Sequence, residues 1–550
     1  MSTVRLPGAR RWWALAAVAL GVSLIVMDAT VVNVALPVII RDLHLSSTQA
    51  EWMNAVYALM FAALLLTLGR VGDLHGRRRL FLVGMVVFVL ASIAAGLSGN
   101  GGELIAARLV QGIGAAMILP ATLSTVNAVF TGRERAIAFA VWGSTIGGMA
   151  ALGPLVGGWL TTDFTWRWAF WINIPVGLLV IAGIISFVPE TRDDTTPPGL
   201  DVLGVALSAT GLGAIVFALI EGQRYGWWRQ PSGAISPIPI VLTLGVLLMA
   251  AFVWTQRVRS RAGRVVLVDL GLLSVRSFRY GSIAALVVAL GEFGLLFTLP
   301  LLLQNALGFS PLGTGWLIVS LAVGTFLVSG ATPQLTHRFG GRAVVRVGLA
   351  LEAVTVAGLA ITLTGTTSGW VIAAWLFGYG LGVGMATAQL TSVILAEIPV
   401  AESGQASGLQ STFRQLGSAL GIAILGTLLI TTLGRSTTTQ LADNGVPAVA
   451  AQPITHAVTQ SAGAVIPALQ AVPATSAAGD AAAAAMIQAS KITTGTAAAI
   501  IALGLAATWA LPKVPVPTAP SPAPAGSDRS TARAGRSARR PAGGPSRPAA

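Results

Sequence analysis

The chain contains no cysteine, which excludes disulfide bonds, thiol redox chemistry and cysteine-based metal sites. Its four histidines are scattered and form no ligand pattern, so we predict no metal site. Charged residues make up only 10% of the 550 residues, whereas a soluble domain has about 25%. No nucleophile–base pair is evident either. We therefore predict that the chain is not an enzyme and uses no cofactor.

Hydrophobic residues instead make up 54% of the chain, and the mean hydropathy is +0.77. Apolar runs recur along nearly the whole length, and each has the roughly 20 residues that a helix needs to cross a bilayer. Backbone amides in lipid must be paired within helices or a closed barrel, and runs this continuous exclude the short alternating strands of a barrel. We predict an all-α polytopic membrane protein with fourteen spans, at approximately 13–40, 50–69, 80–98, 103–128, 136–161, 168–188, 203–221, 237–255, 278–303, 313–334, 343–364, 368–394, 407–431 and 493–511.

The formal net charge of +14 predicts the orientation of these spans. In membrane proteins, Lys and Arg concentrate in cytoplasmic loops, so the basic excess does not indicate nucleic-acid binding. With the N-terminus inside, most of the 34 basic residues fall in inside segments, which favours two cytoplasmic termini and a location in the plasma membrane. The predicted outside segments carry only Arg41, Arg167, Arg224, Arg229, Arg435 and Lys491.

An internal repeat indicates two halves. The basic loop at 69–79 has an echo at 336–342, and each follows the second span of a six-span unit. His337 stands where the first loop has Asp73, so the echo lacks the acid. Parallel repeats of this kind are typical of two-bundle transporters, which bind substrate between the halves near the midplane of the membrane.

The repeat leads to a prediction of five parts. They are a cytoplasmic N-terminus (1–12), a first six-helix bundle (13–188), a linker with two inserted membrane helices (189–277), a second six-helix bundle (278–511) with a long extracytoplasmic loop (432–490), and a disordered cytoplasmic tail (512–550). Within the Ala/Thr-rich loop we expect a short helix near 481–490.

The first basic loop reads Gly69-Arg70-Val71-Gly72-Asp73-Leu74-His75-Gly76-Arg77-Arg78-Arg79. Gly69 and Gly72 would let one helix end approach its neighbour closely. Asp73 could accept hydrogen bonds from a helix N-terminus or pair with an arginine. Gly76 would make the tight turn, and the arginines at 77–79 would anchor at lipid headgroups.

Two ionisable residues lie inside predicted spans, where a charge costs ~2.5–3.5 kcal/mol on insertion scales. Asp28 lies well inside the first span, and such a carboxyl suits a reversible proton carrier. Its alternative role is that of a hydrogen-bonded structural carboxylate. Arg108 lies in the string Leu104-x-x-x-Arg108-x-x-Gln111-Gly112-x-Gly114 and should face protein or water, unless it snorkels to the outer interface.

A third string, Gly153-Pro154-x-x-Gly157-Gly158, falls in the fifth span. Proline removes one helical hydrogen bond, and the glycines permit bending and close packing. By itself, this string could occur in any kinked helix.

Other polar residues inside the spans are weaker candidates. Glu292 could bind a cationic substrate, carry a proton or do both, and Asn33 and Gln304 are candidate substrate contacts. We expect Glu352 to pair with Arg346 or Arg342 near the inner interface, and we expect Glu221, at a helix end, to be solvated.

Together these strings, in this order and spacing, resemble the fourteen-helix drug:proton antiporters of the major facilitator superfamily. The resemblance implies two six-helix bundles plus two inserted helices. It also implies that Asp28 and Arg108 take part in proton coupling, that the 69–79 loop belongs to the gate, and that the Gly153–Gly158 string marks an exporter. Two further stretches resemble this branch, Trp166-Arg167-Trp168-Ala169-Phe170-Trp171-Ile172-Asn173-Ile174-Pro175 and Gly404-x-x-Ser407-Gly408-x-x-x-x-x-x-Arg414-Gln415-x-Gly417.

The function that this resemblance implies is export of hydrophobic or amphipathic, cationic drugs in exchange for protons. The predicted partners are the small-molecule substrate, protons and membrane lipids, with no obligate protein partner. No G-x-x-x-x-G-K-[ST] string is present, so the proton gradient and not ATP is the predicted energy source. The alternatives are a dedicated exporter of an endogenous metabolite, such as an antibiotic or lipid, and a non-transporting membrane sensor.

Overall fold

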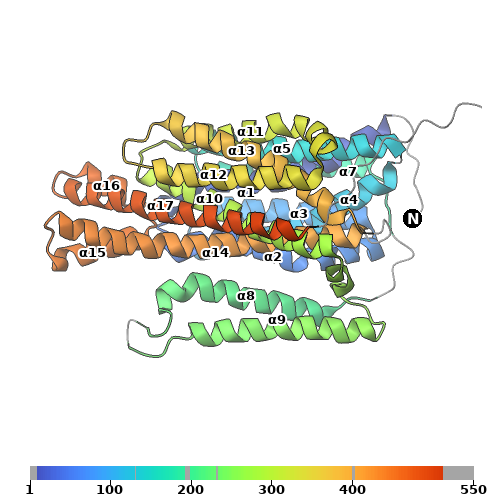
Figure 1. Ribbon diagram of the computed structural model, residues 1–550, viewed down its shortest axis with the longest axis horizontal. Coiled ribbons are helices and arrows are strands. Elements are labelled where there is room, and N and C mark those ends of the chain that lie inside the picture. The colour runs from blue at the N-terminus through green and yellow to red at the C-terminus, as the bar shows by residue number, and fades with distance from the viewer. Residues whose placement is uncertain (1–8, 131, 193–198, 231–232, 399–402, 512–550) are drawn as a thin grey trace, which may run out of the picture. The chain divides into compact units, whose positions relative to one another are not determined.

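The computed structural model describes residues 9–130, 132–192, 199–230, 233–398 and 403–511. In these ranges the chain is helical, and an isolated bridge between Arg229 and Ile235 is the one strand-like pairing there (Figure 1). The helices of the first half are α1 (Arg10–Asp42), α2 (Ser47–His75), α3 (Arg77–Leu97), α4 (Gly101–Val129), α5 (Gly132–Asp163), α6 (Trp168–Trp171) and α7 (Asn173–Phe187). The inserted pair is α8 (Val202–Tyr225) and α9 (Ile238–Arg261).

The short 3₁₀ helix η1 (Leu270–Ser274) leads into the second half. Its helices are α10 (Arg276–Asn305), α11 (Pro311–Phe339), α12 (Gly341–Thr362), α13 (Gly369–Leu395), α14 (Ser403–Asp443), α15 (Ala448–Gln460), α16 (Ile466–Ala471), α17 (Ser476–Ala507) and the 3₁₀ helix η3 (Thr508–Ala510). Among the described residues, thirteen helices are long and apolar enough to cross a membrane. The remaining predicted span, 136–161, falls within α5, some of whose side chains lie outside the described set. The sixth span is divided between α6 and α7.

Local sequence signals explain several helix starts. The Ser46 hydroxyl accepts a hydrogen bond from the Gln49 amide (3.2 Å), and the Gln49 side chain accepts one from the Ser46 amide (3.0 Å). This reciprocal capping box begins α2. Asn100 caps α4 by accepting from the Glu103 amide at 3.0 Å. Ser310 caps α11 in the same way, and Pro311 follows at the first helical position, where its missing N–H costs nothing.

The helices pack as two bundles. In the first bundle, α1 packs against α5 and α7, and α4 packs against α2 and α3. In the second, α10 packs against α14 and α17, and α13 packs against α11 and α12. The bundles meet where α5 contacts α11 and where α2 contacts α14.

The predicted internal repeat is visible in the backbone. Gly76 ends α2 at a φ of +117°, and Gly340 ends α11 at a φ of +83°. The Gly76 amide donates to the Gly72 carbonyl at 2.9 Å, and the Gly340 amide donates to the Thr336 carbonyl at 2.8 Å. Because L side chains rarely adopt positive φ, glycine at both positions allows the chain to turn directly into the next helix.

The segment 432–490, predicted as a loop, is largely helical. α14 continues to Asp443, α15 and α16 follow, and α17 begins at Ser476, so the short helix expected near 481–490 is part of α17. Alanine, the residue with the highest helix propensity, dominates this stretch. Side chains from it are buried in one core with the neighbouring ends of α1 and α2, among them Val458, Ala462 and Ile466.

The inserted helices pair with each other, and α8 also packs against α2 and α14. α9 leaves large apolar side chains exposed, including Ile240, Leu247 and Trp254. An apolar face of this kind is stable in contact with lipid tails. The predicted tail at 512–550 lies outside the described residues.

Candidate functional site

The structure brings Asp28 and Arg108 together as a buried ion pair. Asp28 lies on α1 and Arg108 on α4, and their side chains are 0% and 1% exposed. The Arg108 Nη1 donates to Asp28 Oδ2 at 2.5 Å. Arg108 therefore does not snorkel to the interface, because its charge is neutralised inside the first bundle.

Three more polar side chains complete the network around this pair. Gln111 on α4 donates to Asp28 Oδ1 at 2.8 Å and accepts from Arg108 at 2.6 Å. Asn173, the first residue of α7, also donates to Asp28 Oδ1 at 2.8 Å. The Ser92 hydroxyl of α3 accepts from both amide groups, at 2.9 and 3.1 Å. Side chains of α4 and α7 thus hold a single carboxylate of α1, with Ser92 of α3 supporting the two amides, and buried charges persist only when they are paired and hydrogen-bonded in this way.

An aromatic ring covers the guanidinium. The Arg108 Cζ lies 4.2 Å from the centroid of the Tyr57 ring and 6.0 Å from that of Phe170. The Arg108 Nε donates to the Met53 carbonyl of α2 at 3.3 Å. Tyr57 is buried, and its hydroxyl has no hydrogen-bond partner among the described residues. The ring face stabilises the cation.

Sequence reasoning missed Tyr57, Ser92, Gln111 and Asn173 as parts of this site. Gln111 and Asn173 were already within strings that resemble the family, and each is an amide side chain in an apolar span. That pattern was the available signal. Ser92 and Tyr57 carry no comparable signal, because a serine or tyrosine in a membrane helix is common and easily satisfied locally.

The Gly153–Gly158 string lies where three helices meet. A Cβ at Gly153 would overlap the Thr30 hydroxyl on α1, and one at Gly157 would lie 2.8 Å from the Val31 carbonyl. A Cβ at Gly158 would lie 2.6 Å from the Pro311 carbonyl of α11, in the other bundle. Pro154 lies inside α5. The glycines therefore allow α5 to pack closely against both α1 and α11.

In the basic loop, Asp73 pairs with Arg77. Arg77 donates to Asp73 Oδ1 from Nε at 2.9 Å and from Nη2 at 2.7 Å, so the pair joins α2 to the first residue of α3. Arg77 is 3% exposed, which corrects the expectation that it anchors at lipid headgroups. A Cβ at Gly69 would lie 3.2 Å from Pro120 of α4, and one at Gly72 would lie 3.0 Å from Leu80 of α3.

Glu190, which the sequence analysis did not identify, caps the N-terminus of α3. Its carboxylate accepts from the backbone amides of Arg78 (3.1 Å) and Arg79 (3.2 Å). A Cβ at Gly76 would lie 2.6 Å from Glu190 Oε1, so glycine is required there for space as well as for its positive φ. The Arg77 amide donates to the Thr191 carbonyl at 2.9 Å. The loop is therefore bound to the segment that follows α7.

The structure separates the remaining candidates. Glu292 is half-buried on α10, within electrostatic range of Arg414 on α14. Asn33 is half-buried on α1. Gln304 is buried and donates to the Val34 carbonyl at 2.8 Å, so it connects α10 to α1.

Two expectations about acidic residues are wrong. Glu352 does not pair with Arg342 or Arg346, because these arginines donate to the carbonyls of Trp509 (2.8 Å) and Thr508 (3.2 Å). Backbone carbonyls exposed at the end of the last helix attract the arginines instead.

Glu221 is 8% exposed and not solvated. It accepts from the Trp52 indole at 3.0 Å, so it binds α8 to α2. Nearby Glu51, also buried, accepts from Gln223 of α8 (3.3 Å) and Thr427 of α14 (3.5 Å). The inserted pair is therefore attached to the first bundle through two buried carboxylates, and Thr427 of the second bundle donates to the Leu219 carbonyl of α8 at 2.9 Å.

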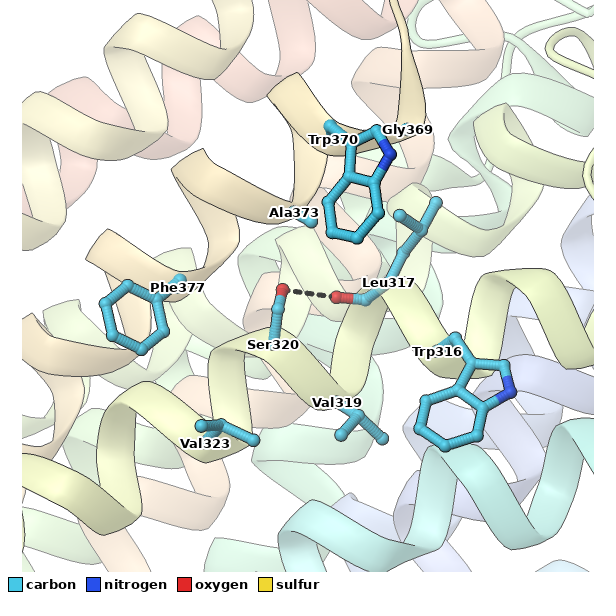
Figure 2. Close-up of a pocket in the computed structure, with 9 residues that line it drawn as sticks. All are labelled: Trp316, Leu317, Val319, Ser320, Val323, Gly369, Trp370, Ala373 and Phe377. Carbon is cyan, nitrogen blue, oxygen red and sulfur yellow. Dashed lines mark hydrogen bonds between the residues drawn. The ribbon is translucent and has the colours of Figure 1, made fainter.

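A groove of about 620 Å³ lies between α11 and α13 (Figure 2). Its lining is apolar apart from Ser320, whose hydroxyl donates to the Leu317 carbonyl at 2.6 Å. Trp316 and Trp370 are 59% and 87% exposed. None of the predicted site residues lines it. Indole rings at the rim of an apolar groove are typical of the membrane interface, and the groove offers no group for proton chemistry.

Comparison with known proteins agrees with this architecture. The chain is 35% identical to the "Probable actinorhodin transporter" of Streptomyces coelicolor over 80% of this chain and 75% of that protein. It is 37% identical to the "Puromycin resistance protein pur8" of Streptomyces alboniger (82% and 88%). It is 34% identical to the "Multidrug efflux pump LfrA" of Mycolicibacterium smegmatis (78% and 82%).

Solved structures share the fold at low sequence identity. A bacterial homologue of the human lysosomal transporter Spinster, inward-facing and occupied, aligns with a TM-score of 0.62 at 17% identity, covering 92% of this chain and 97% of that one. The human organic anion transporter MFSD10 aligns at 0.55 and 17% identity, covering 91% and 100%. The sequence profile of the Major Facilitator Superfamily matches residues 18–202 and 200–422. The chain is an integral membrane transporter, not an enzyme, and it belongs to the Major Facilitator Superfamily.

Proposed function

We propose that the protein exports hydrophobic or amphipathic, cationic compounds across the plasma membrane in exchange for protons. Both termini are cytoplasmic in this proposal, and the proton gradient is the only energy source. The observation that carries it is the Asp28 carboxylate, buried completely and held by Arg108, Gln111 and Asn173 from other helices. Burying an ionisable group inside a membrane span costs free energy, and such residues usually have a role in transport or proton transfer.

Protonation of Asp28 gives this network two states. A neutral Asp28 no longer balances the charge of Arg108, so the guanidinium must find other acceptors or move toward water. Because α1 and α4 are joined through this pair, its loss favours a different packing of the two helices. α1 also packs against α5, and its Val34 carbonyl accepts a hydrogen bond from Gln304 of the second bundle, so the change can reach the contact between bundles.

Export then proceeds by alternating access. The close approach of Gly158 to Pro311 and the hydrogen bond from the Leu312 amide to Thr162 (3.1 Å) hold α5 against α11. We place this contact at the extracytoplasmic end, where it must open before cargo leaves. Glu292, within electrostatic range of Arg414, is the carboxylate that we assign to cationic cargo or to a proton, with Asn33 as a further contact.

The relatives support two classes of cargo. They include a multidrug efflux pump and a methyl viologen resistance protein, which favour drug export. They also include a probable actinorhodin transporter and a tetracenomycin C resistance and export protein, which favour a dedicated exporter of an endogenous antibiotic. A non-transporting sensor gains no support from these names.

Proton-coupled export can be tested with purified protein in liposomes, using ethidium as the cargo. We expect ethidium to accumulate inside only when the interior is acidic, with the membrane potential clamped by valinomycin and potassium. A protonophore should abolish accumulation, because it removes the gradient without touching the protein. Equal accumulation with and without the pH difference would exclude antiport. Resistance of an efflux-deficient host to puromycin, methyl viologen and ethidium would then separate broad drug export from export of one metabolite.

The gating role of Asp73 gives a separate prediction. Asp73→Ala leaves the buried Arg77 without the carboxylate that pairs with it. A loss of about 1.4 kcal/mol in the stability of the closed loop corresponds to a roughly tenfold change in the transport rate. We expect ethidium transport to slow by about that factor, while ethidium affinity, measured by fluorescence polarisation, stays within twofold. Glu134→Ala is a matched control, since it removes a carboxylate paired with Arg11 in a partly exposed bridge. A loss of affinity at an unchanged maximal rate would contradict a gating role.

A further inference from the structure

Glu352 is a buried carboxyl group that has no hydrogen-bond partner among the described residues. It lies in the middle of α12 and is 1% exposed. Within the part of the chain that the structure describes, neither of its carboxyl oxygens has a hydrogen-bond donor. This sets it apart from Asp28, whose two oxygens accept three hydrogen bonds from Arg108, Gln111 and Asn173.

The side chain of Glu352 lies in the seam between α12 and α13. A Cβ at Gly382 of α13 would lie 2.6 Å from Glu352 Cγ, so the two helices are close at this point. One turn before Gly382 on the same helix, Tyr379 is 1% exposed, and its hydroxyl also has no partner among the described residues. Residues three apart lie on the same face of a helix, so both unpaired groups belong to this seam.

The charges around the seam come from several elements. Glu292 on α10 and Arg414 on α14 act electrostatically on Glu352, and all three groups act on Tyr379.

The other helices packed against α12 carry few charged residues. α17 carries Asp480 and Lys491 in its first half, α11 carries His337 and Arg338 in its last turn, and η3 has no charged residue. Arg342 and Arg346 of α12 itself are occupied by backbone carbonyls.

A carboxylate with no donor and no counter-charge in contact is unstable in a low-dielectric interior, and it neutralises by binding a proton. The two carboxyl oxygens have essentially no accessible surface, so an organic cation cannot reach them in this conformation. We propose that Glu352 is a second proton-binding site, in the second bundle, and that it holds its proton as the neutral acid in the conformation described here. Release of that proton requires the α12–α13 seam to open toward water or toward Arg414.

This site is separate from the Asp28 network, which lies in the first bundle. Protonation of Glu352 does not depend on the proposed antiport. The effect of this protonation on transport does depend on the proposed antiport. If the carboxyl groups of Asp28 and Glu352 both exchange protons in each cycle, removal of Glu352 lowers the proton-to-cargo ratio by one. The two statements therefore need separate measurements.

The first measurement is infrared spectroscopy of the purified full-length protein in lipid nanodiscs, which requires no cargo. At neutral pH we expect the wild-type protein to show a protonated-carboxyl C=O band that is absent in Glu352→Gln. The Glu51→Gln variant is the matched control, because Glu51 is also buried but accepts hydrogen bonds from Gln223 and Thr427. If Glu352→Gln fails to fold, Glu352→Asp should keep the band and move its frequency. Identical carboxyl regions in the wild type and in the Glu352 variants would overturn the proposal.

The second measurement is the number of protons that move per ethidium in liposomes, taken from the pH difference that just balances a known ethidium gradient while valinomycin and potassium clamp the membrane potential. We expect the ratio to fall by one in Glu352→Gln and to stay unchanged in Glu51→Gln. An unchanged ratio in Glu352→Gln would overturn the role of the site in the transport cycle. If transport ignores the pH gradient altogether, the proposed antiport fails, and the infrared result still decides whether Glu352 binds a proton.

Discussion

Asp28→Asn is expected to abolish the dependence of ethidium export on the pH gradient. Asparagine keeps the size of the side chain, and its single amide oxygen can replace one of the two carboxylate oxygens that accept from Arg108 and from Gln111. It cannot bind and release a proton. The accumulation driven by an acidic interior should therefore fall to that of protein-free liposomes. The measurement is the liposome assay with a clamped potential, together with the amount of folded protein after purification.

Asp42→Asn is the control for removing a negative charge from the same helix. Asp42 also pairs with an arginine, Arg167 at 3.0 Å, but its side chain is 48% exposed and lies outside the buried network. We expect Asp42→Asn to retain coupled export. Coupled export by Asp28→Asn at the wild-type rate would remove Asp28 from the mechanism and would leave the buried pair with a structural role only.

Arg108→Leu is expected to cost about 3–5 kcal/mol in the free energy of unfolding, because it leaves the Asp28 carboxylate buried without its counter-charge. The double variant Asp28→Asn with Arg108→Leu should recover most of this loss, since no unpaired charge remains. Unfolding of the purified proteins in detergent measures the stability of all four members of the double-mutant cycle. We expect a coupling energy above about 2 kcal/mol between the two positions.

The same cycle on Arg167 and Asp42 is the reference for an exposed pair. Pairs at the surface contribute only about 0–1 kcal/mol, so Arg167→Leu should have a small effect. Additive effects of the Asp28 and Arg108 substitutions would mean that their charges do not compensate each other in the folded protein. The proposed two-state network would then lose its basis.

Sequence reasoning predicted the membrane helices well, because the hydrocarbon core of a bilayer permits few backbone structures. Each apolar run must pair its amides internally, and a run of about 20 residues does so as one helix across the bilayer. It was less successful at 432–490, where the apolar signal weakens but alanine still favours a helix. It also did not anticipate the break between α6 and α7, which places Asn173 at the start of a helix beside Asp28.

For the site, the sequence identified the costly residues but not their partners. Asp28 and Arg108 stood out because each is ionisable at membrane depth. Their pairing across 80 positions depends on how α1 and α4 cross, which no local pattern encodes. The same limit explains the errors at Glu221 and Glu352. Position along a helix was used to judge solvation and pairing, whereas both depend on which helices pack around the side chain.

The sequence by itself determined that this protein is a bundle of membrane helices built from two related halves, since hydropathy, basic loops and glycine positions are properties of single segments. Only the tertiary structure decided which buried charges are neutralised and which are not. Asp28 lies within reach of a guanidinium and two amide groups, while Glu352 lies against Gly382 with no donor among the described residues. The physical reason is that electrostatic stabilisation inside a membrane protein depends on distances of a few ångströms between side chains from different helices.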